Sequence, residues 1–231
     1  MNYAVILSGG IGTRMNNLGV PKQYFKVKNK MILEYTMELF EKSESVDFIV
    51  LVIADEWKTD LEQILRAKYT KLAAFAKPGR NRQESILHGL EECIKRTQGH
   101  NDVVIVHDAV RPCLSLQLIK ACVDSIPEYD GSMPVLPMKD TIYQSNDGKA
   151  VSRLLERSRI FAGQAPEAFL LQKYYEANKS LPENELMKIN GSTEVAFKAS
   201  LDICMIPGEE SNFKITTQED LKRFTEIVEG R

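Results

Sequence analysis

Cysteine and histidine are scarce in this chain. Its 231 residues include four cysteines and three histidines. The cysteines form no Cys-x-x-Cys pair, and none lies beside a histidine at the spacing of metal ligands, so no zinc site is predicted. We also find no serine–histidine–acid arrangement. We interpret the cysteines as small core residues that stay reduced in the cytoplasm; they are Cys93, Cys113, Cys122 and Cys204.

An excess of one charge and a long apolar run are also missing. The 30 lysines and arginines are balanced by 32 aspartates and glutamates, which excludes an extended basic surface for duplex nucleic acid. No apolar run approaches the length of a membrane span. The first residues, MNYAVIL, lack a basic segment and a small-residue cleavage site, so we interpret them as a buried strand. We therefore expect a cytoplasmic protein that binds neither nucleic acid nor a membrane.

What the sequence does contain is an alternation of strand-like and helix-like segments. Near-continuous apolar runs at 3–8, 48–53 and 103–107 indicate parallel strands that are buried on both faces. Segments with the apolar spacing of helices lie at 31–42, 84–96 and 218–229. Thr217, three residues before Asp220, gives the last of them a start that resembles a capping box. We predict a single α/β domain over residues 1–231, with a Rossmann-like, mostly parallel twisted sheet flanked by helices.

Residues 137–160 break this alternation. Short strand-like pieces surround Asn146-Asp147-Gly148, and an Asp-Gly pair between such pieces is a strong hairpin signal. We predict a β-hairpin that projects from the domain as a dimerisation arm. The alternative is an ordinary hairpin at the sheet edge.

A glycine-rich loop follows the first predicted strand. In ILSGGIGTRM, residues 6–15, the glycines let the backbone approach a phosphate and point N–H groups at it. The dinucleotide fingerprint needs a further glycine where Met15 stands, and the Gly-Lys-Ser/Thr ending of a P-loop is absent. A hydride-transferring Rossmann enzyme and a Walker-type NTPase are therefore disfavoured.

Two cations and one acid stand at positions suited to a triphosphate. Arg14 and Lys22 bracket the glycine-rich loop and would stabilise phosphate charge that grows during a reaction. Taken singly, each is better explained as a solvated surface charge. Asp108 ends the apolar strand of VVIVHDAVRP, where a carboxylate often holds magnesium between phosphates. The alternative for Asp108 is a cap on the next turn.

Five motifs occur in a fixed order: GGIGTRM, PKQY (21–24), GRNRQESI (79–86), HDAVRP and N-x-K-I-T (212–216). In these motifs the chain resembles the polyol-phosphate cytidylyltransferases, which include methylerythritol phosphate and ribitol-5-phosphate cytidylyltransferases. The resemblance spans nearly the whole chain. It implies that a polyol phosphate attacks the α-phosphorus of CTP, that pyrophosphate leaves, that Mg²⁺ assists, and that the enzyme is a homodimer.

The resemblance also implies roles for individual residues. Arg14, Lys22 and Lys214 would be the catalytic cations. Asp108 would hold the metal in addition to binding the nucleotide. Gly79, Arg82 and Ser85 would help to recognise cytosine. Thr141 and Arg157 of the arm would reach across the dimer to bind the acceptor phosphate. The implied nucleotide-binding residues are Leu7, Ser8, Gly9, Gly10, Gly12, Thr13, Gly79, Arg82, Ser85, Asp108 and Arg111.

Departures from the family pattern fall mostly on the acceptor side. The methylerythritol branch usually carries T-P-Q and T-D-E-A, where this chain has Ala165-Pro166-Glu167 and Ser192-Thr193-Glu194-Val195. The Ser-Gly-Gly of the first loop is closer to the A-G-G of the ribitol branch than to A-A-G. We therefore expect ribitol 5-phosphate, or a related alditol phosphate, as the acceptor in preference to methylerythritol phosphate.

Two other functions fit part of the pattern. A sugar-1-phosphate nucleotidyltransferase that uses UTP or GTP has a similar glycine-rich loop, but GRNRQES and HDAVRP argue against it. A catalytically silent nucleotide-binding subunit is the alternative from another class. The presence of Arg14, Lys22 and Asp108 argues against that alternative.

Overall fold

The computed structural model describes residues 1–10 and 19–230. The predicted site residues Gly12, Thr13 and Arg14 lie outside the described residues. The elements in chain order are β1 (Asn2–Leu7), η2 (Lys22–Tyr24), β2 (Lys26–Val27), β3 (Lys30–Met31), α1 (Ile32–Lys42), β4 (Phe48–Val52), α2 (Asp55–Lys68), β5 (Leu72–Ala76), α3 (Arg82–Ile94), β6 (Val103–Asp108), α4 (Leu116–Asp124), β7 (Gly131–Pro137), β8 (Tyr143–Gln144), β9 (Arg153–Leu154), η3 (Arg157–Arg159), β10 (Phe161–Gly163), β11 (Glu167–Leu170), α5 (Leu171–Ser180), α6 (Glu183–Leu186), α7 (Ser192–Lys198), β12 (Ile203–Pro207) and α8 (Gln218–Glu229).

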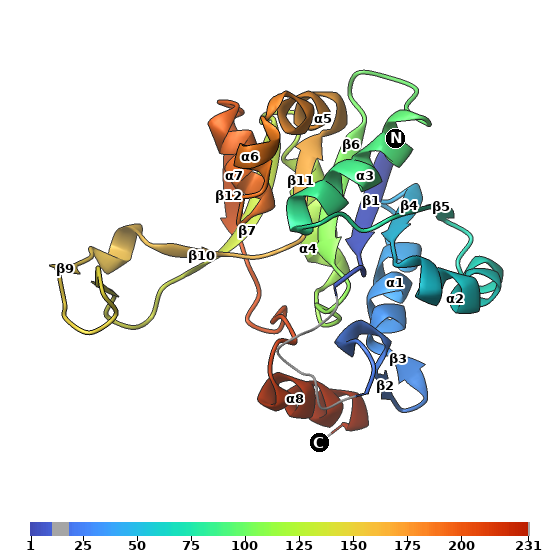
Figure 1. The fold of residues 1–231 in the computed structure, drawn as a ribbon, viewed down its shortest axis with the longest axis horizontal. Helices are drawn as coiled ribbons and strands as arrows, with labels where there is room; N and C mark the ends of the chain where they lie inside the picture. The colour runs from blue at the N-terminus through green and yellow to red at the C-terminus, as the bar shows by residue number, and fades with distance from the viewer. Residues whose placement is uncertain (11–18, 231) are drawn as a thin grey trace.

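A mixed, mostly parallel sheet forms the centre of the molecule (Figure 1). Its strand order within the described residues is β10-β7-β11-β6-β1-β4-β5, and β12 pairs with β7. Strands β5, β4, β1 and β6 are parallel to one another, whereas β11 is antiparallel to both β6 and β7. The predicted α/β fold with a mostly parallel sheet is confirmed.

The register brings several strand ends to one edge of the sheet. Leu7 at the end of β1 pairs with Val52 of β4 and with Asp108 of β6. Because β11 runs in the opposite direction, its first residue, Glu167, pairs with Val106 close to the same edge. The loops that follow β1, β4 and β6 therefore leave the sheet side by side, which is where ligands bind in folds of this kind.

Side chains of β1 alternate between two hydrophobic cores, one on each face of the sheet. Ala4 and Ile6 pack in the core formed with α1 and α4. Tyr3 and Val5 pack in the core formed with α3, α5 and α7. Burial on both faces explains why the strand reads as a near-continuous apolar run.

The C-terminal helix α8 fixes the segment that precedes it. Leu221 and Phe224 pack against Ile32 and Ile215 in a third core. Thr217 caps the helix by accepting a hydrogen bond from the Asp220 amide, and the Asp220 carboxylate accepts one from the Thr217 amide. This confirms the capping pattern expected there. The helix thereby anchors residues 212–216 beside the strand ends.

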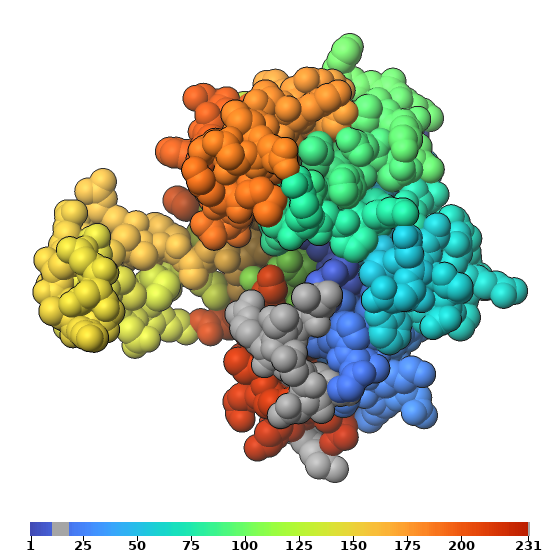
Figure 2. Space-filling model, in the orientation of Figure 1, coloured from blue at the N-terminus to red at the C-terminus, as the bar shows by residue number. Residues whose placement is uncertain are grey.

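The predicted hairpin is present as β8 and β9, between β7 and β10, and it stands away from the body of the molecule (Figures 1 and 2). In its turn, the Asp147 carboxylate accepts hydrogen bonds from the amides of Lys149 and Ala150. Gly148 adopts the left-handed conformation, with φ of 72°. Tyr143 and Leu154 on the hairpin are about 60% exposed, at 59% and 61%.

Two further expectations can be compared with the structure. The four cysteines are free, as the sequence predicts, and Cys93 and Cys122 are core residues, whereas Cys113 and Cys204 are only half-buried. Within residues 1–10 and 19–230, we find no helix with the length and apolar character that crossing a membrane requires.

Close packing of α3 on β1 gives a test of the fold. A Cβ atom at Gly89 would lie 2.5 Å from Cγ1 of Val5, so we expect Gly89→Val to destabilise the protein by ~1–3 kcal/mol through overpacking. Gly99→Val is the matched control, since nothing lies within 4 Å of a Cβ at that exposed position. Urea denaturation measures both. Equal stability of the two variants would contradict the described packing.

Candidate active site

The glycine-rich loop is held by the residues of PKQY. The Gln23 side-chain amide donates hydrogen bonds to the carbonyls of Ser8 (2.8 Å) and Gly10 (2.7 Å). The Ser8 amide donates to the carbonyl of Val52 at 2.8 Å. Gln23 and Ser8 are both buried. The start of the loop is therefore fixed by β4 on one side and by η2 on the other.

Tyr24 reinforces the same contact. Its hydroxyl donates to the Ser8 carbonyl at 3.0 Å, and its ring stacks on Trp57 of α2 with a centroid separation of 4.2 Å. Burial raises the pKa of Tyr24 to about 12, so the hydroxyl keeps its proton at neutral pH. The chain has no tryptophan other than Trp57.

Gly9 permits the loops after β1 and β5 to pack closely, and Gly79 permits the second loop to fold against the start of α3. A Cβ at Gly9 would lie 2.5 Å from Cβ of Pro78, and a Cβ at Gly79 would lie 2.7 Å from the main-chain carbon of Glu84. The Ser85 hydroxyl accepts a hydrogen bond from the Gly79 amide at 2.9 Å. A Cβ at Gly10 would meet open space instead. The loops after β1 and β5 therefore pack together beside the ends of the strands.

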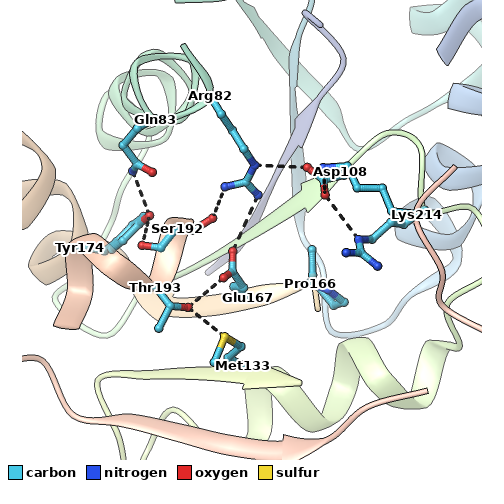
Figure 3. Close-up of polar contacts among 12 residues, drawn as sticks. Arg82, Gln83, Asp108, Met133, Pro166, Glu167, Tyr174, Ser192, Thr193 and Lys214 are labelled. Atoms are coloured by element: carbon cyan, nitrogen blue, oxygen red, sulfur yellow. Dashed lines mark hydrogen bonds and ion pairs between the residues drawn. The ribbon is translucent and has the colours of Figure 1, made fainter. Parts of the chain in front are cut away.

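Asp108 lies at the centre of the site, where it meets three cations (Figure 3). Its Oδ2 atom is 2.9 Å from Lys214 Nζ and 3.4 Å from Arg111 Nε, and its Oδ1 atom is 3.3 Å from Arg82 Nε. Burial favours the neutral acid, but the charges of Arg82, Lys214 and Arg111 outweigh it and hold the pKa of Asp108 well below its usual range. Asp108 is therefore ionised.

The neighbouring His107 is neutral at physiological pH. Its ring is fully buried, and this burial lowers its pKa to about 4. Its Nε2 atom lies 3.1 Å from the carbonyl oxygen of Arg111, and its Nδ1 atom has no hydrogen-bond partner among the described residues. His107 adds no charge to the site.

Arg82 extends the cluster away from Asp108. Its Nη1 atom donates to the Ser192 hydroxyl at 2.6 Å, and its Nη2 atom lies 3.8 Å from Oε2 of Glu167. The Oε1 atom of Glu167 accepts a hydrogen bond from the Thr193 hydroxyl at 2.8 Å (Figure 3). The guanidinium thus connects β6, β11 and α7. The role at cytosine expected for Arg82 stays a prediction.

The N-x-K-I-T segment, residues 212–216, forms hydrogen bonds with three other parts of the site. The Asn212 side-chain amide donates to the Ala165 carbonyl at 2.6 Å, and the backbone carbonyl of Asn212 accepts from Arg111 Nη1 at 2.8 Å. Lys22 Nζ donates to the Ile215 carbonyl at 2.7 Å. Lys22, Arg111 and Lys214 are therefore tied to one short segment.

Most of the described candidate residues gather at this edge of the sheet. Figure 2 shows a depression on that face, where dark blue, green and red parts of the chain meet. Those gathered there are Leu7, Ser8, Gly9, Gly10, Lys22, Gly79, Arg82, Ser85, Asp108, Arg111 and Lys214. Thr141 and Arg157 are exposed on the arm, where Arg157 donates to the Lys139 carbonyl. The single chain does not bring these two residues into the cluster.

Sequence reasoning assigned no role to several residues that shape the site. Gln23 and Asn212 stand inside recognised motifs, so their motif positions were the available signal. Glu167 and Thr193 stood out as departures from the family pattern, and the structure places them next to Arg82.

The contacts of Gln23 predict a local effect of mutation. Gln23→Leu leaves the carbonyls of Ser8 and Gly10 without their side-chain donor, so we expect the loop to open more often. Hydrogen exchange monitored by mass spectrometry should show amides 8–10 exchanging at least about tenfold faster. Gln172→Leu is the control, because the Gln172 amide donates to Glu176 on the solvent-facing side of α5, and it should leave that exchange unchanged.

The chain is similar over nearly its whole length to known cytidylyltransferases. A curated ribitol-5-phosphate cytidylyltransferase of Streptococcus agalactiae serotype V is 29% identical over 232 residues, covering 100% of this chain and 96% of that protein. The crystal structure of 2-C-methyl-D-erythritol 4-phosphate cytidylyltransferase from Francisella tularensis superposes with a TM-score of 0.79 at 25% identity, over 96% of this chain and 97% of the other.

The same fold occurs in the 4-diphosphocytidyl-2C-methyl-D-erythritol synthase of Anaerococcus prevotii, with a TM-score of 0.81 at 24% identity and coverage of 100% and 99% of the two chains. The family described as IspD, 2-C-methyl-D-erythritol 4-phosphate cytidylyltransferase, matches residues 2–230. Because this match spans nearly the whole chain, the chain belongs to the IspD family of cytidylyltransferases.

Proposed function

We propose that this cytidylyltransferase transfers CMP from CTP to ribitol 5-phosphate and releases pyrophosphate. The assignment of a nucleotide as the donor substrate rests on one observation. Arg82, Arg111 and Lys214 pack around Asp108, beside the glycine-rich loop. Full-length similarity to curated ribitol-5-phosphate cytidylyltransferases supports the acceptor. Methylerythritol phosphate is the second candidate, and the family match and the similar crystal structures favour it.

The chemistry follows from the charges. An oxygen of the acceptor phosphate forms a bond to the α-phosphorus of CTP, while the bond from that phosphorus to the bridging oxygen of the β-phosphate breaks. The attacking oxygen is already anionic, so the step needs no general base. Catalysis is then positioning together with neutralisation of phosphate charge. Lys22, Lys214 and Arg14 are the cations that we assign to this task.

Within the described residues, no three histidine, cysteine, aspartate or glutamate side chains converge as a metal cage would require. The Asp108 carboxylate stands among the cations, and the Glu167 carboxylate lies beside Arg82. Magnesium in nucleotide enzymes commonly uses one or two carboxylates and takes its other ligands from phosphates and water. The donor set therefore fits Mg²⁺ that arrives with CTP and meets Asp108, and such an ion would neutralise phosphate charge.

We also propose that the active form is a cytoplasmic homodimer. Thr141 and Arg157 can bind an acceptor phosphate in the cluster only if the arm of a second copy supplies them, because the arm of the same chain points away from the body (Figure 1). The exposed apolar side chains of Tyr143, Val151 and Leu154 on the arm support such a contact. Free cysteines support a reducing compartment.

A pyrophosphate-release assay tests the proposed reaction. With CTP, we expect turnover of ribitol 5-phosphate to exceed that of methylerythritol phosphate and glycerol 3-phosphate by at least about tenfold in kcat/KM, which is ~1.4 kcal/mol. UTP, GTP and ATP in place of CTP are the nucleotide controls. A preference for methylerythritol phosphate would overturn the acceptor, and release with UTP or GTP alone would overturn the nucleotide.

Lys22 provides a test of the cations. We expect Lys22→Ala to lower kcat by about 10²–10³-fold, as for the loss of one preorganised charge in a transition state. Its thermal unfolding should stay within a few degrees of the unaltered protein, because the side chain is only partly buried. Lys26→Ala changes a nearby exposed lysine and should keep full turnover. Undiminished turnover by Lys22→Ala would refute the assignment.

A further inference from the structure

The strand order of the sheet places different elements on the two sides of the Asp108 cluster. The loops with Gly9 and Gly79 follow β1 and β5, which lie on one side of β6, whereas β11 and β7 lie on the other. A nucleotide seated against the glycine loops therefore leaves the β11 side of Asp108 for the acceptor. The arm also leaves the sheet from this side, between β7 and β10.

Glu167, at the start of β11, places a carboxylate on that side, and much of its hydrogen-bonding capacity is unused among the described residues. The residue is 7% exposed. Among the described residues, its carboxylate accepts one hydrogen bond, from Thr193, and makes one ion pair, at 3.8 Å from Arg82. A carboxylate has about four lone-pair sites, and buried polar groups are normally satisfied. The spare acceptor capacity suits the hydroxyl groups of a polyol, which are hydrogen-bond donors.

The two acceptor-side departures from the family pattern meet in space. Glu167 replaces the glutamine of T-P-Q, and Thr193 replaces the aspartate of T-D-E-A. Their side chains are hydrogen-bonded to each other at 2.8 Å. Compared with that pattern, this chain has a carboxylate at position 167 and a hydroxyl at position 193, and its Glu167 carboxylate lies 3.8 Å from Arg82.

We propose that Glu167 is a specificity-determining residue for the acceptor. Thr193 and Arg82 hold its carboxylate in place, and the carboxylate accepts a hydrogen bond from a hydroxyl group of the alditol chain. This inference rests on the proposed function, because it takes an alditol phosphate to be the acceptor.

Steady-state kinetics of Glu167→Gln test the proposal, with ribitol 5-phosphate and CTP varied separately. Loss of a charged hydrogen-bond acceptor should raise the KM for ribitol 5-phosphate about tenfold or more. The KM for CTP should change by less than about twofold. Glu41→Gln is the matched control, because Glu41 also accepts a hydrogen bond from a threonine, Thr70, but lies on α1 away from the cluster. It should leave both KM values unchanged.

The double variant Glu167→Gln/Thr193→Asp separates recognition from simple charge balance. It returns the carboxylate to position 193, so a role limited to balancing Arg82 predicts recovery of the KM for ribitol 5-phosphate. Recognition of a hydroxyl by Glu167 predicts that this KM stays raised. Recovery in the double variant, a parallel rise of both KM values in Glu167→Gln, or an unchanged acceptor KM would each overturn the proposal.

If the proposed function itself is wrong, the result differs from a failure of the Glu167 proposal. It would be seen in the unaltered protein, as turnover of methylerythritol phosphate and none of ribitol 5-phosphate. The same variants are then compared with methylerythritol phosphate, which also carries hydroxyl groups. A raised KM for that acceptor in Glu167→Gln alone would support the assignment of Glu167, and an unchanged KM would overturn it.

Discussion

The charge of Asp108 is the interaction on which the rest of the site depends. Three cations from α3, from the loop after β6 and from the segment before α8 point at one buried carboxylate. Without that carboxylate they would repel one another in a poorly solvated place. With it they form a compact cluster that remains net positive, since even the additional carboxylate of Glu167 leaves three cations against two anions. The site is therefore ready for an anion before any ligand arrives.

The pairing register of the strands places the residues of this cluster at one edge of the sheet. Asp108 and Leu7 stand opposite each other at neighbouring strand ends, and Glu167 reaches the same edge because β11 runs antiparallel to β6. The carbonyl and side chain of Asn212 then connect Arg111 to Ala165, close to Glu167. Segments more than a hundred residues apart are thus held by hydrogen bonds that leave the cationic side chains directed at one place. A small shift of one strand would move several charges together.

The sequence predicted the parts of this arrangement that are local. The apolar run at 103–107 located β6, and its last residues placed Asp108 at the strand end. The cap of α8 followed from Thr217 and Asp220 alone. Motif order was sufficient to identify Lys22 and Lys214 as members of one site. The contact between Glu167 and Thr193 could not be predicted, because it joins a strand to a helix through an antiparallel pairing that no local pattern specifies. Gln23 was missed for a related reason, since its amide bonds to carbonyl groups, which every residue has.

The stack of Trp57 on Tyr24 gives the protein a built-in optical reporter. The indole is in direct contact with a ring whose hydroxyl bonds to the first residue of the glycine-rich loop, and no second indole contributes to the emission. Indole fluorescence depends on the neighbouring ring and on the local polarity. Binding of a ligand to the glycine-rich loop can therefore be followed by the fluorescence of Trp57 in the unlabelled chain, as fast as the solutions can be mixed.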